Sequence, residues 1–411
     1  GCGLLRWISN KAIGRKEYTE LRRIFVRIRG ARQAHRSLCN CYCNVRSWTI
    51  KTSKLVYSLI EIALFSSCVL RHGKESPLRH RRRPRVLFAT NRGERKITEE
   101  TILKIVLAKP RGFCAGVVRA VKIVKLALEK YEPPIYVFHE IVHNPYVVND
   151  LREKGAVFVD SLDEVPTGAV TIFSAHGVST SVVEQAKRKQ LKVIDATCPL
   201  VTKVHLQAQK YYRKDCEIVI IGHLGHEEIE GTMGSVPGPV HIIVTPEDVD
   251  QLRIDAPAKV AYVTQTTLSV DDTKDVIAAL HERFPDIKGP STDDICYATQ
   301  NRQNAVRQLS DKVDLLLVVG ARNSSNSNRL REVSTQCGTL AHLIQDETEI
   351  RADWFTDVNH VGVTAGTSTP EVLVQRVITH LGKYDPTTVH TMEGVEEKIK
   401  FALPRQLRMD P

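Results

Sequence analysis

The sequence has no uninterrupted apolar run of the roughly 18–20 residues that a membrane-spanning helix requires. The nearest candidate, Leu55–Leu70, is shorter and contains Glu61. The sequence also lacks a Walker phosphate loop and a GxGxxG dinucleotide fingerprint. We therefore expect no membrane span, and a phosphate group would have to be bound by other means.

Closely spaced cysteines are missing from the larger part of the chain. The five cysteines after residue 100 are far apart and odd in number, unlike a secreted disulfide framework. A reducing compartment, and hence a cytoplasmic location, is expected. Cys216 and Cys337 are interpreted as small buried apolar residues.

Acidic residues are scarce at the start of the chain. Residues 1–100 contain 23 Lys and Arg against 7 Asp and Glu, whereas the remaining 311 residues contain 35 and 40. The net charge of +11 therefore belongs to the N-terminal part, and no nucleic-acid partner is expected for the rest.

Residues 1–98 are interpreted as a basic N-terminal extension that is disordered, a transit peptide for a plastid-type organelle, or non-native. The chain begins with Gly1 instead of Met, so we expect that its true start is missing or misassigned. The triplet Cys39, Cys41 and Cys43 has no second Cys or His pair at zinc-finger spacing, and the run Arg81–Arg83 is typical of a solvated tail.

After residue 101, β-branched apolar runs alternate with helical patterns, including helical stretches at 117–130 and 301–313. Such alternation is typical of an α/β fold with parallel sheets. The predicted strands are Ile102–Leu107, Ile135–Phe138, Val170–Phe173, Val193–Ile194, Ile218–Ile221, Val260–Thr264, Leu315–Val319 and Val361–Thr364.

The same region repeats one plan three times. Cys114, Cys198 and Cys296 each open a polar turn into a helix. A strand then ends in a polar cluster (HEIVHN, GHLGHEEIEG, ARNSSNSNR), and a second strand ends in a shorter one (FSAHGVS, TQTTLSV, TAGTSTP). The intervals match as well as the order. The first clusters place His143, His226 and Asn326 at nearly equal intervals after their cysteines, and the second clusters place His176, Thr266 and Ser368 at similar ones.

This repeat predicts three α/β domains related by a pseudo-threefold axis, with their polar loops directed at one centre. The expected domains are residues 99–197, 198–293 and 294–390, followed by a tail, 391–411, that packs back on them.

Three cysteines at helix starts can hold a metal, because exposed N–H groups there stabilise negative sulfur. Zinc with three Cys and one His is one option, and a 4Fe–4S cluster with one open iron is the other. Because the ligands come from three different domains, we favour iron–sulfur.

Neutral or cationic donors occupy equivalent loop ends around this centre, and such a set suits a diphosphate group. They are His143, His176, His226, Ser324, Ser325, Asn326 and Ser368. A desolvated carboxyl could donate a proton, with Thr266 as a relay. Spacing alone does not choose among Glu140, Glu227, Glu228 and Glu230. The segment HEIVH has zincin spacing, but Pro145 follows it, which indicates a loop instead of a helix.

The motifs KPRGFCAGV, HEIVHNPYVV, DATCPLVTKVH, GHEEIEGTMG, DDICYATQNRQ and NSSNSNRL together resemble the 4-hydroxy-3-methylbut-2-enyl diphosphate reductase (LytB/IspH) family over about residues 102–411. The resemblance implies a cloverleaf of three α/β domains around one 4Fe–4S cluster with three Cys ligands and one open iron. It implies reductive dehydroxylation to isopentenyl and dimethylallyl diphosphate, the last step of the non-mevalonate pathway, with ferredoxin or flavodoxin as electron donor.

Residue by residue, the resemblance implies that Cys114, Cys198 and Cys296 ligate the cluster and that Glu228 delivers protons with Thr266. Thr266 would also bind substrate, and the donors of the loop ends would bind the diphosphate. One position departs from the family: Val118 replaces an acidic residue in the helix after Cys114.

Two other functions remain open from the residues alone. A non-redox hydro-lyase could use the open iron as a Lewis acid. A zinc-stabilised protein with a basic nucleic-acid-binding arm is the candidate from a different class.

Overall fold

The structure is a computed structural model that describes residues 103–290, 294–383 and 387–408. The chain divides into two units, Gly1–Arg92 and Gly93–Pro411, and all described residues belong to the second. The interpretations of residues 1–98, including the cysteine triplet and the arginine run, therefore lie outside the described residues.

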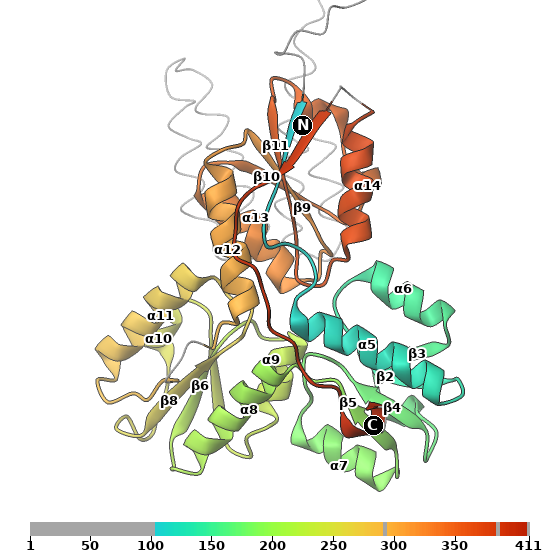
Figure 1. Ribbon diagram of the computed structural model, residues 1–411. Coiled ribbons are helices and arrows are strands. Elements are labelled where there is room, and N and C mark those ends of the chain that lie inside the picture. Colours follow the sequence, from blue (N-terminus) through green and yellow to red (C-terminus); the bar gives the residue numbers. More distant parts are fainter. Residues whose placement is uncertain (1–102, 291–293, 384–386, 409–411) are drawn as a thin grey trace, which may run out of the picture. The chain divides into compact units, whose positions relative to one another are not determined.

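Three parallel β-sheets organise the described residues into three lobes (Figure 1). The first lobe has the strand order β3-β2-β4-β5, the second β7-β6-β8 and the third β10-β9-β11-β1-β12. Every pairing between these strands is parallel. The predicted α/β class with three repeated units is confirmed.

The elements follow the chain in an alternating order. The first lobe contains α5 (Ala115–Lys130), β2 (Ile135–Phe138), α6 (Pro145–Glu153), β3 (Ala156–Val159), η3 (Leu162–Glu164), β4 (Val170–Phe173), α7 (Thr180–Arg188) and β5 (Lys192–Asp195). The second contains α8 (Pro199–Tyr212), β6 (Glu217–Ile221), α9 (Glu227–Met233), β7 (Val240–Ile243), α10 (Pro246–Gln251), β8 (Val260–Thr264) and α11 (Val270–Arg283).

The third lobe begins with a strand from the start of the described chain. It contains β1 (Leu103–Leu107), α12 (Tyr297–Ser310), β9 (Leu315–Val319), α13 (Ser325–Gln336), β10 (Leu340–Ile344), η4 (Glu347–Glu349), η5 (Ala352–Phe355), β11 (His360–Ala365), α14 (Glu371–Leu381) and β12 (Thr387–Thr391). A last short helix, η6 (Arg405–Leu407), lies against α5 of the first lobe.

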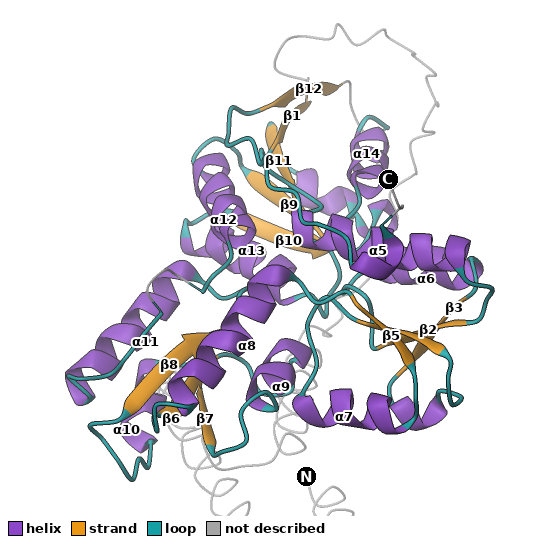
Figure 2. Cartoon of the chain, turned by 60° about the horizontal axis from the view of Figure 1, so that its bottom comes forward, coloured by secondary structure: helices purple, strands orange, loops and turns teal. Residues whose placement is uncertain are grey.

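The central strands are apolar on both faces because each sheet separates two cores. In β9, Leu315, Leu317 and Val319 enter one core, while Leu316 and Val318 enter the other. The central strands β2 and β6 alternate in the same way. Figure 2 shows the corresponding helices, with α5 and α6 on one face of the first sheet and α7 on the other.

All eight predicted strands are observed, apart from Ile102, which lies outside the described residues. Four further strands, β3, β7, β10 and β12, were missed. All four are edge strands. Polar residues at exposed or half-buried positions interrupt the apolar pattern of β7, β10 and β12, whereas β3 (AVFV) is a short apolar run that was not recognised.

The chain segment before each cysteine pairs with the sheet of the lobe that comes before that cysteine's helix. For the first lobe, this neighbour is the third lobe. β5 extends the first sheet and leads to Cys198, whereas Lys288 bridges to Ala261 of β8 before Cys296. β1 pairs with β11 and β12 in the third sheet and leads to Cys114. The prediction that residues 99–197 form one unit is therefore wrong for β1, because its partner strands come from the opposite end of the described chain.

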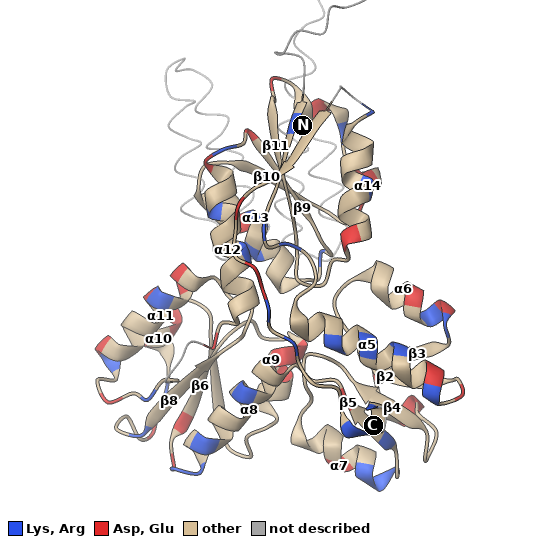
Figure 3. Ribbon diagram, in the orientation of Figure 1, with Lys and Arg blue, Asp and Glu red and all other residues tan. Residues whose placement is uncertain are grey.

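Lys and Arg are interspersed with Asp and Glu along the described helices (Figure 3). No helix in the described part of the chain is long and apolar enough to cross a membrane.

The C-terminal segment, residues 392–408, returns from the third lobe to the first. Leu407 in η6 is buried in the core formed by α5, β2 and α6.

Replacing Leu407 with alanine (Leu407→Ala) is expected to lower the free energy of unfolding by about 2–4 kcal/mol, since a cavity remains. Leu206→Ala, at a 57% exposed position of α8, is the control and is expected to have little effect in the same urea titration. Equal effects of the two substitutions would contradict this placement of the segment.

Candidate active site

Cys114, Cys198 and Cys296 are the N-cap residues of α5, α8 and α12. All three have extended backbone conformations, and Pro199 occupies the first helical position after Cys198. Their side chains therefore lie at the N-terminal ends of three helices, one per repeat, where the helix dipole favours negative charge.

The turns that end the second strand of each repeat fix the cysteine backbones. The N–H of Cys198 donates to the carbonyl oxygen of Ala175 at 3.0 Å, and the N–H of Cys296 donates to that of Thr266 at 3.1 Å. The N–H of Cys114 donates to the carbonyl oxygen of Thr367 at 3.3 Å. Each cysteine is thus held by the lobe before it in the same cyclic order as the strands.

The sulfurs of Cys114 and Cys198 converge over Gly116. A Cβ atom at Gly116 would lie 2.8 Å from the Cys198 Sγ and 3.8 Å from the Cys114 Sγ. Both sulfurs are therefore neighbours of the same small volume beside the first turn of α5. Glycine is required here by close approach, and the space that a side chain would fill is left to the sulfurs.

The spacing of the three sulfurs suits a cluster better than one zinc ion. Among the described residues, the three potential ligand atoms that lie within 4.8 Å of one another belong to His143, His176 and Glu227, not to the three cysteines. A single tetrahedral zinc with Zn–S bonds of about 2.3 Å would bring its sulfurs to about 3.8 Å from one another. At least one pair of the three sulfurs is therefore farther apart than the ligands of a single zinc ion, as a cluster of several metal atoms requires.

Without metal, the thiols of Cys198 and Cys296 are held in their protonated form. Burial raises the pKa of Cys198 to about 12 and that of Cys296 to about 11. The neighbouring cysteines add to both shifts, because thiolates at short range repel one another. A bound cation of high charge would reverse this preference, so the donor set fits an iron–sulfur group.

His143, His176 and His226, here called the histidine cluster, lie in contact. The rings of His143 and His176 stack with centroids 4.2 Å apart, and His226 stands edge-on to both, at 5.5 and 6.0 Å. Burial lowers the pKa of His176 and lowers that of His226 to about 3, with the other imidazoles as further causes. His176 and His226 are therefore neutral near pH 7 without a ligand, and an anion beside them would raise their pKa.

Two glutamates face the histidine cluster. Oε2 of Glu227 is 2.7 Å from Nδ1 of His176, and Oε2 of Glu140 is 3.2 Å from Nδ1 of His143. Burial alone would raise the pKa of Glu227, but the hydrogen bond and charge of His176 and the charge of His143 lower it to about 2. These carboxylates favour protonated imidazoles and fix which ring nitrogen faces away from them.

Glu228 differs from those two glutamates in the residue that its carboxylate contacts and in its deeper burial. It is 2% exposed, and its carboxylate accepts hydrogen bonds from the Thr266 N–H at 2.7 Å and the Thr266 hydroxyl at 3.0 Å. Burial raises the pKa of Glu228 to about 7, although both bonds from Thr266 oppose the shift. Since Thr266 also binds the Cys296 backbone, Glu228 is connected directly to a cysteine loop.

The polar residues of the third repeat gather at the start of α13. Ser324 caps this helix by accepting from the Ser327 N–H, and Ser325 accepts the hydroxyl proton of Thr267 at 3.0 Å. Asn326 is 2% exposed, and its Nδ2 has no hydrogen-bond partner among the described residues. An unsatisfied buried donor at a helix N-terminus fits a site that accepts an anion.

Ser368 joins the third lobe to the histidine cluster. Its hydroxyl donates to the carbonyl oxygen of His143 at 2.9 Å, and the Asn323 side chain donates to Glu140 at 3.1 Å. The structure therefore brings all the residues expected at the site to the junction of the lobes.

Several neighbours were not expected from the sequence. Glu140 and Glu227 appeared only as competitors of Glu228, although contact with imidazoles is what distinguishes them. Thr267 adjoins Thr266. Arg302 donates to the Gly112 carbonyl oxygen before Cys114 and pairs with Glu397, and no local pattern indicates these contacts because the partners are far apart in the sequence.

Three smaller expectations can be compared with the structure. The HEIVH segment (His139–His143) is a loop before α6, as Pro145 indicated. Cys216 is buried, but Cys337 is exposed at the C-cap of α13, so the prediction of burial is wrong for Cys337. Val118 is 50% exposed in the first turn of α5, which has no acidic residue.

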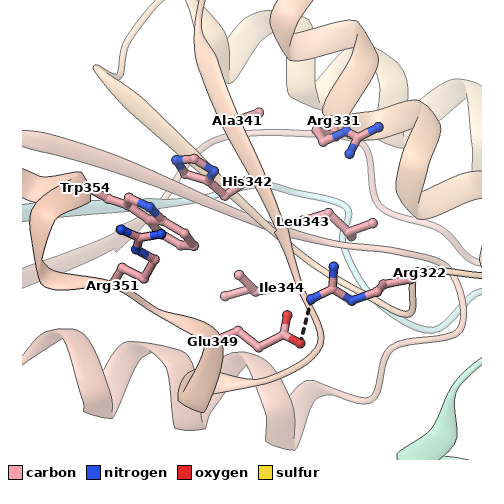
Figure 4. A pocket seen from close by; sticks show the side chains of 9 residues that line it. All are labelled: Arg322, Arg331, Ala341, His342, Leu343, Ile344, Glu349, Arg351 and Trp354. Carbon is pink, nitrogen blue, oxygen red and sulfur yellow. Dashed lines mark hydrogen bonds and ion pairs between the residues drawn. The ribbon is translucent and has the colours of Figure 1, made fainter. Parts of the chain in front are cut away.

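A separate hollow lies on the third lobe, between β10 and η5 (Figure 4). His342 stacks on Trp354 there, and Arg322 is paired with Glu349 at 2.9 Å. None of the cysteines or histidines of the site lines it.

These features define the class of protein: an α/β protein of three repeated lobes in which three helix-capping cysteines lie near a cluster of imidazoles. The sequence matches the family model described as LytB protein over residues 105–382. The chain therefore belongs to the LytB family.

The chain spans nearly the whole length of several relatives. The 4-hydroxy-3-methylbut-2-enyl diphosphate reductase 2 of Bradyrhizobium diazoefficiens is 58% identical over 305 residues, which are 74% of this chain and 99% of that protein. Reductase 1 of Rhodopseudomonas palustris is 59% identical over 301 residues, 73% of this chain and 98% of that protein. The solved E-1-hydroxy-2-methyl-but-2-enyl-4-diphosphate reductase from Plasmodium falciparum has a TM-score of 0.72 at 39% identity, covering 74% of this chain and 97% of that one.

Gly116→Ala tests the convergence of the sulfurs. The added methyl group would collide with the Cys198 Sγ, so the variant is expected to retain much less iron than the wild type after anaerobic reconstitution. Helix propensity alone would favour the alanine by about 1 kcal/mol, so a weakened helix cannot explain such a loss. Gly382→Ala, where the nearest atom is 3.6 Å away, is the control. Wild-type iron content in Gly116→Ala would contradict the packing described here.

Proposed function

We propose that the chain reduces 4-hydroxy-3-methylbut-2-enyl diphosphate to isopentenyl and dimethylallyl diphosphate, in the last step of the non-mevalonate pathway. The observation that carries the proposal is the connection of the three cysteine loops, Glu228 and the histidine cluster at one junction. The reductase names of the relatives favour this reaction over a non-redox hydro-lyase.

Cys114, Cys198 and Cys296 hold one 4Fe–4S cluster in this proposal, and one iron has no protein ligand. When bound, the cluster supplies the electrons for C–O cleavage and a Lewis acid for the departing hydroxyl. The chain's own residues bind the diphosphate, orient the allylic alcohol and deliver protons.

The diphosphate occupies the histidine cluster and the start of α13. Nδ1 of His226 accepts the N–H of Glu228 at 3.1 Å, so its Nε2 carries the proton and can donate to a phosphate oxygen. Negative charge raises the pKa of the neighbouring imidazoles, and Glu140 and Glu227 support their charged forms. Ser324, Ser325, Asn326 and Ser368 add neutral donors from the third lobe.

Glu228 is the proton donor, and Thr266 positions it. The hydroxyl and N–H of Thr266 bind both carboxylate oxygens, so the carboxyl group has a fixed orientation. With a pKa near 7, the group is protonated in a large fraction of molecules at neutral pH, which suits a general acid. Thr266 also contributes a hydroxyl for the substrate.

The electron donor in this proposal is ferredoxin or flavodoxin. The reaction takes place in the cytoplasm, or in a plastid-type organelle if residues 1–98 act as a transit peptide. Mass spectrometry of the intact protein from its source tests the second location, because a transit peptide would be absent from the mature chain.

Glu228→Gln is expected to lower kcat by about 10²–10⁴-fold, the usual contribution of a general acid. The iron content should remain that of the wild type, because Glu228 ligates no metal in this proposal. Glu230→Gln, at an exposed position of α9, is the matched control. Loss of iron in Glu228→Gln, or loss of activity in both variants, would contradict the assignment.

The raised pKa of Glu228 also predicts two pH effects. Turnover in the wild type should fall as the pH rises above about 7, because the protonated acid disappears. Stability of the apoprotein should fall relative to Glu228→Gln from pH 4.5 to about 7, since the unfolded carboxyl ionises first. Thermal unfolding across this range measures the difference, and parallel curves for the two proteins would contradict the assigned pKa.

Anaerobic reconstitution tests the function itself. The loaded protein is expected to absorb broadly near about 400 nm and to convert the substrate only when dithionite supplies electrons. Conversion without a reductant would indicate a hydro-lyase, and bound zinc without this absorption would exclude the reductase.

A further inference from the structure

Each helix with a cysteine at its N-cap carries a cation in its second turn. Arg119 follows Cys114 in α5, Lys203 follows Cys198 in α8, and Arg302 follows Cys296 in α12. Long side chains on a helix point back toward its N-terminus, so these heads can reach the loops around the cysteines.

Arg119 contacts the loop that precedes the next cysteine. Its Nη1 donates to the carbonyl oxygens of Ala196 at 3.1 Å and Thr197 at 3.0 Å, immediately before Cys198. Its Nε donates to the carbonyl oxygen of Ala402 in the C-terminal segment at 2.8 Å. One guanidinium therefore joins α5, the Cys198 loop and that segment.

Arg302 makes the corresponding contacts from α12. Its Nε and Nη2 donate to the carbonyl oxygen of Gly112, in the loop before Cys114, at 3.1 and 2.8 Å. Its Nη1 lies 3.0 Å from Oε1 of Glu397, which also belongs to the C-terminal segment. Arg302 is 1% exposed, so its charge depends on these partners.

Lys203 makes the third contact of this kind, from α8. Its Nζ lies 3.4 Å from Oδ1 of Asp294, in the loop before Cys296. The second carboxylate oxygen of Asp294 accepts the N–H of Thr264 at the end of β8, at 3.3 Å. The three cations thus bind the loops before Cys198, Cys296 and Cys114 in turn, the same cyclic order as the strands and the cysteine N–H bonds.

We propose that Arg119, Lys203 and Arg302 form a cation ring of positioning residues that holds the three cysteine loops at the separation the iron–sulfur group needs. The ring opposes the mutual repulsion of three thiolates while they are loaded. Glu397 and Ala402 of the C-terminal segment secure two of its three members. This inference rests on the proposal that the cysteines hold the cluster.

Two matched pairs of variants test the ring. Arg302→Gln is compared with Arg307→Gln, since Arg307 lies on the same helix and forms an ion pair with Asp271, whose side chain is 58% exposed. Lys203→Met is compared with Lys210→Met, an exposed position of α8. Each full-length protein is reconstituted anaerobically, and iron loss to a ferrous chelator is followed together with the electron paramagnetic resonance spectrum.

Arg302→Gln and Lys203→Met are expected to lose iron about 10–100-fold faster than the wild type, the usual size of effects from residues that orient metal ligands. Their resonance lines should shift, whereas Arg307→Gln and Lys210→Met should match the wild type. Lys203→Arg should restore slow loss, because it keeps the charge near Asp294.

Leu381→Ala separates positioning from general stability, since Leu381 is fully buried in the core under α14 and contacts neither the cations nor the C-terminal segment that secures them. If Arg302→Gln and Leu381→Ala lose iron equally fast at matched melting temperatures, the ring is overturned. If Arg302→Gln does not fold, the comparison of Lys203→Met with Lys210→Met decides, and equal rates in that pair overturn the ring. A wild-type protein that binds no iron would instead refute the proposed function.

Discussion

The arrangement of the whole structure depends on bringing three thiols from distant parts of the chain to one buried place, where their negative forms repel. Each thiol is placed at the N-cap of a helix, so the exposed N–H groups of three helix ends lie beside the thiols. The sheets, the polar turns and the cations all act on the short loops that precede these helices. The lobes supply the rigidity that the loops alone would lack.

The cyclic order of the contacts explains how one plan can be used three times. In every case the strand, the carbonyl oxygen and the cation that fix a cysteine come from the neighbouring unit. No lobe completes its own cysteine loop, so loss of any one lobe would affect two cysteines, the one at the start of its own helix and the one whose loop it holds. The histidine cluster and the start of α13 lie in the remaining space. Their hydrogen-bond donors differ from one repeat to the next, so the site is asymmetric although the three lobes share one plan.

Much of this could be predicted from the sequence, because the central strands are buried on both faces and read as continuous apolar runs. Four edge strands were missed; in β12 the exposed positions carry polar residues, whereas the more apolar edge strands β5 and β8 were predicted. The pairing of β1 with β11 could not be predicted, because no local sequence pattern identifies a partner strand from the other end of the described chain. The same limit applies to Arg302 and Glu397. The matched intervals between each cysteine and its polar clusters did predict which loops meet. The roles of the glutamates could not be predicted, because only their partners in the structure, His143, His176 and Thr266, distinguish them.

The path of the C-terminal segment has a consequence for biosynthesis. Cys114 is translated first among the three cysteines, yet its loop is held by Thr367 and by Arg302, whose charge is balanced by Glu397. The proposed cluster site is therefore complete only after the C-terminal segment has been synthesised, and a chain truncated before Glu397 would lack the carboxylate that balances the buried charge of Arg302.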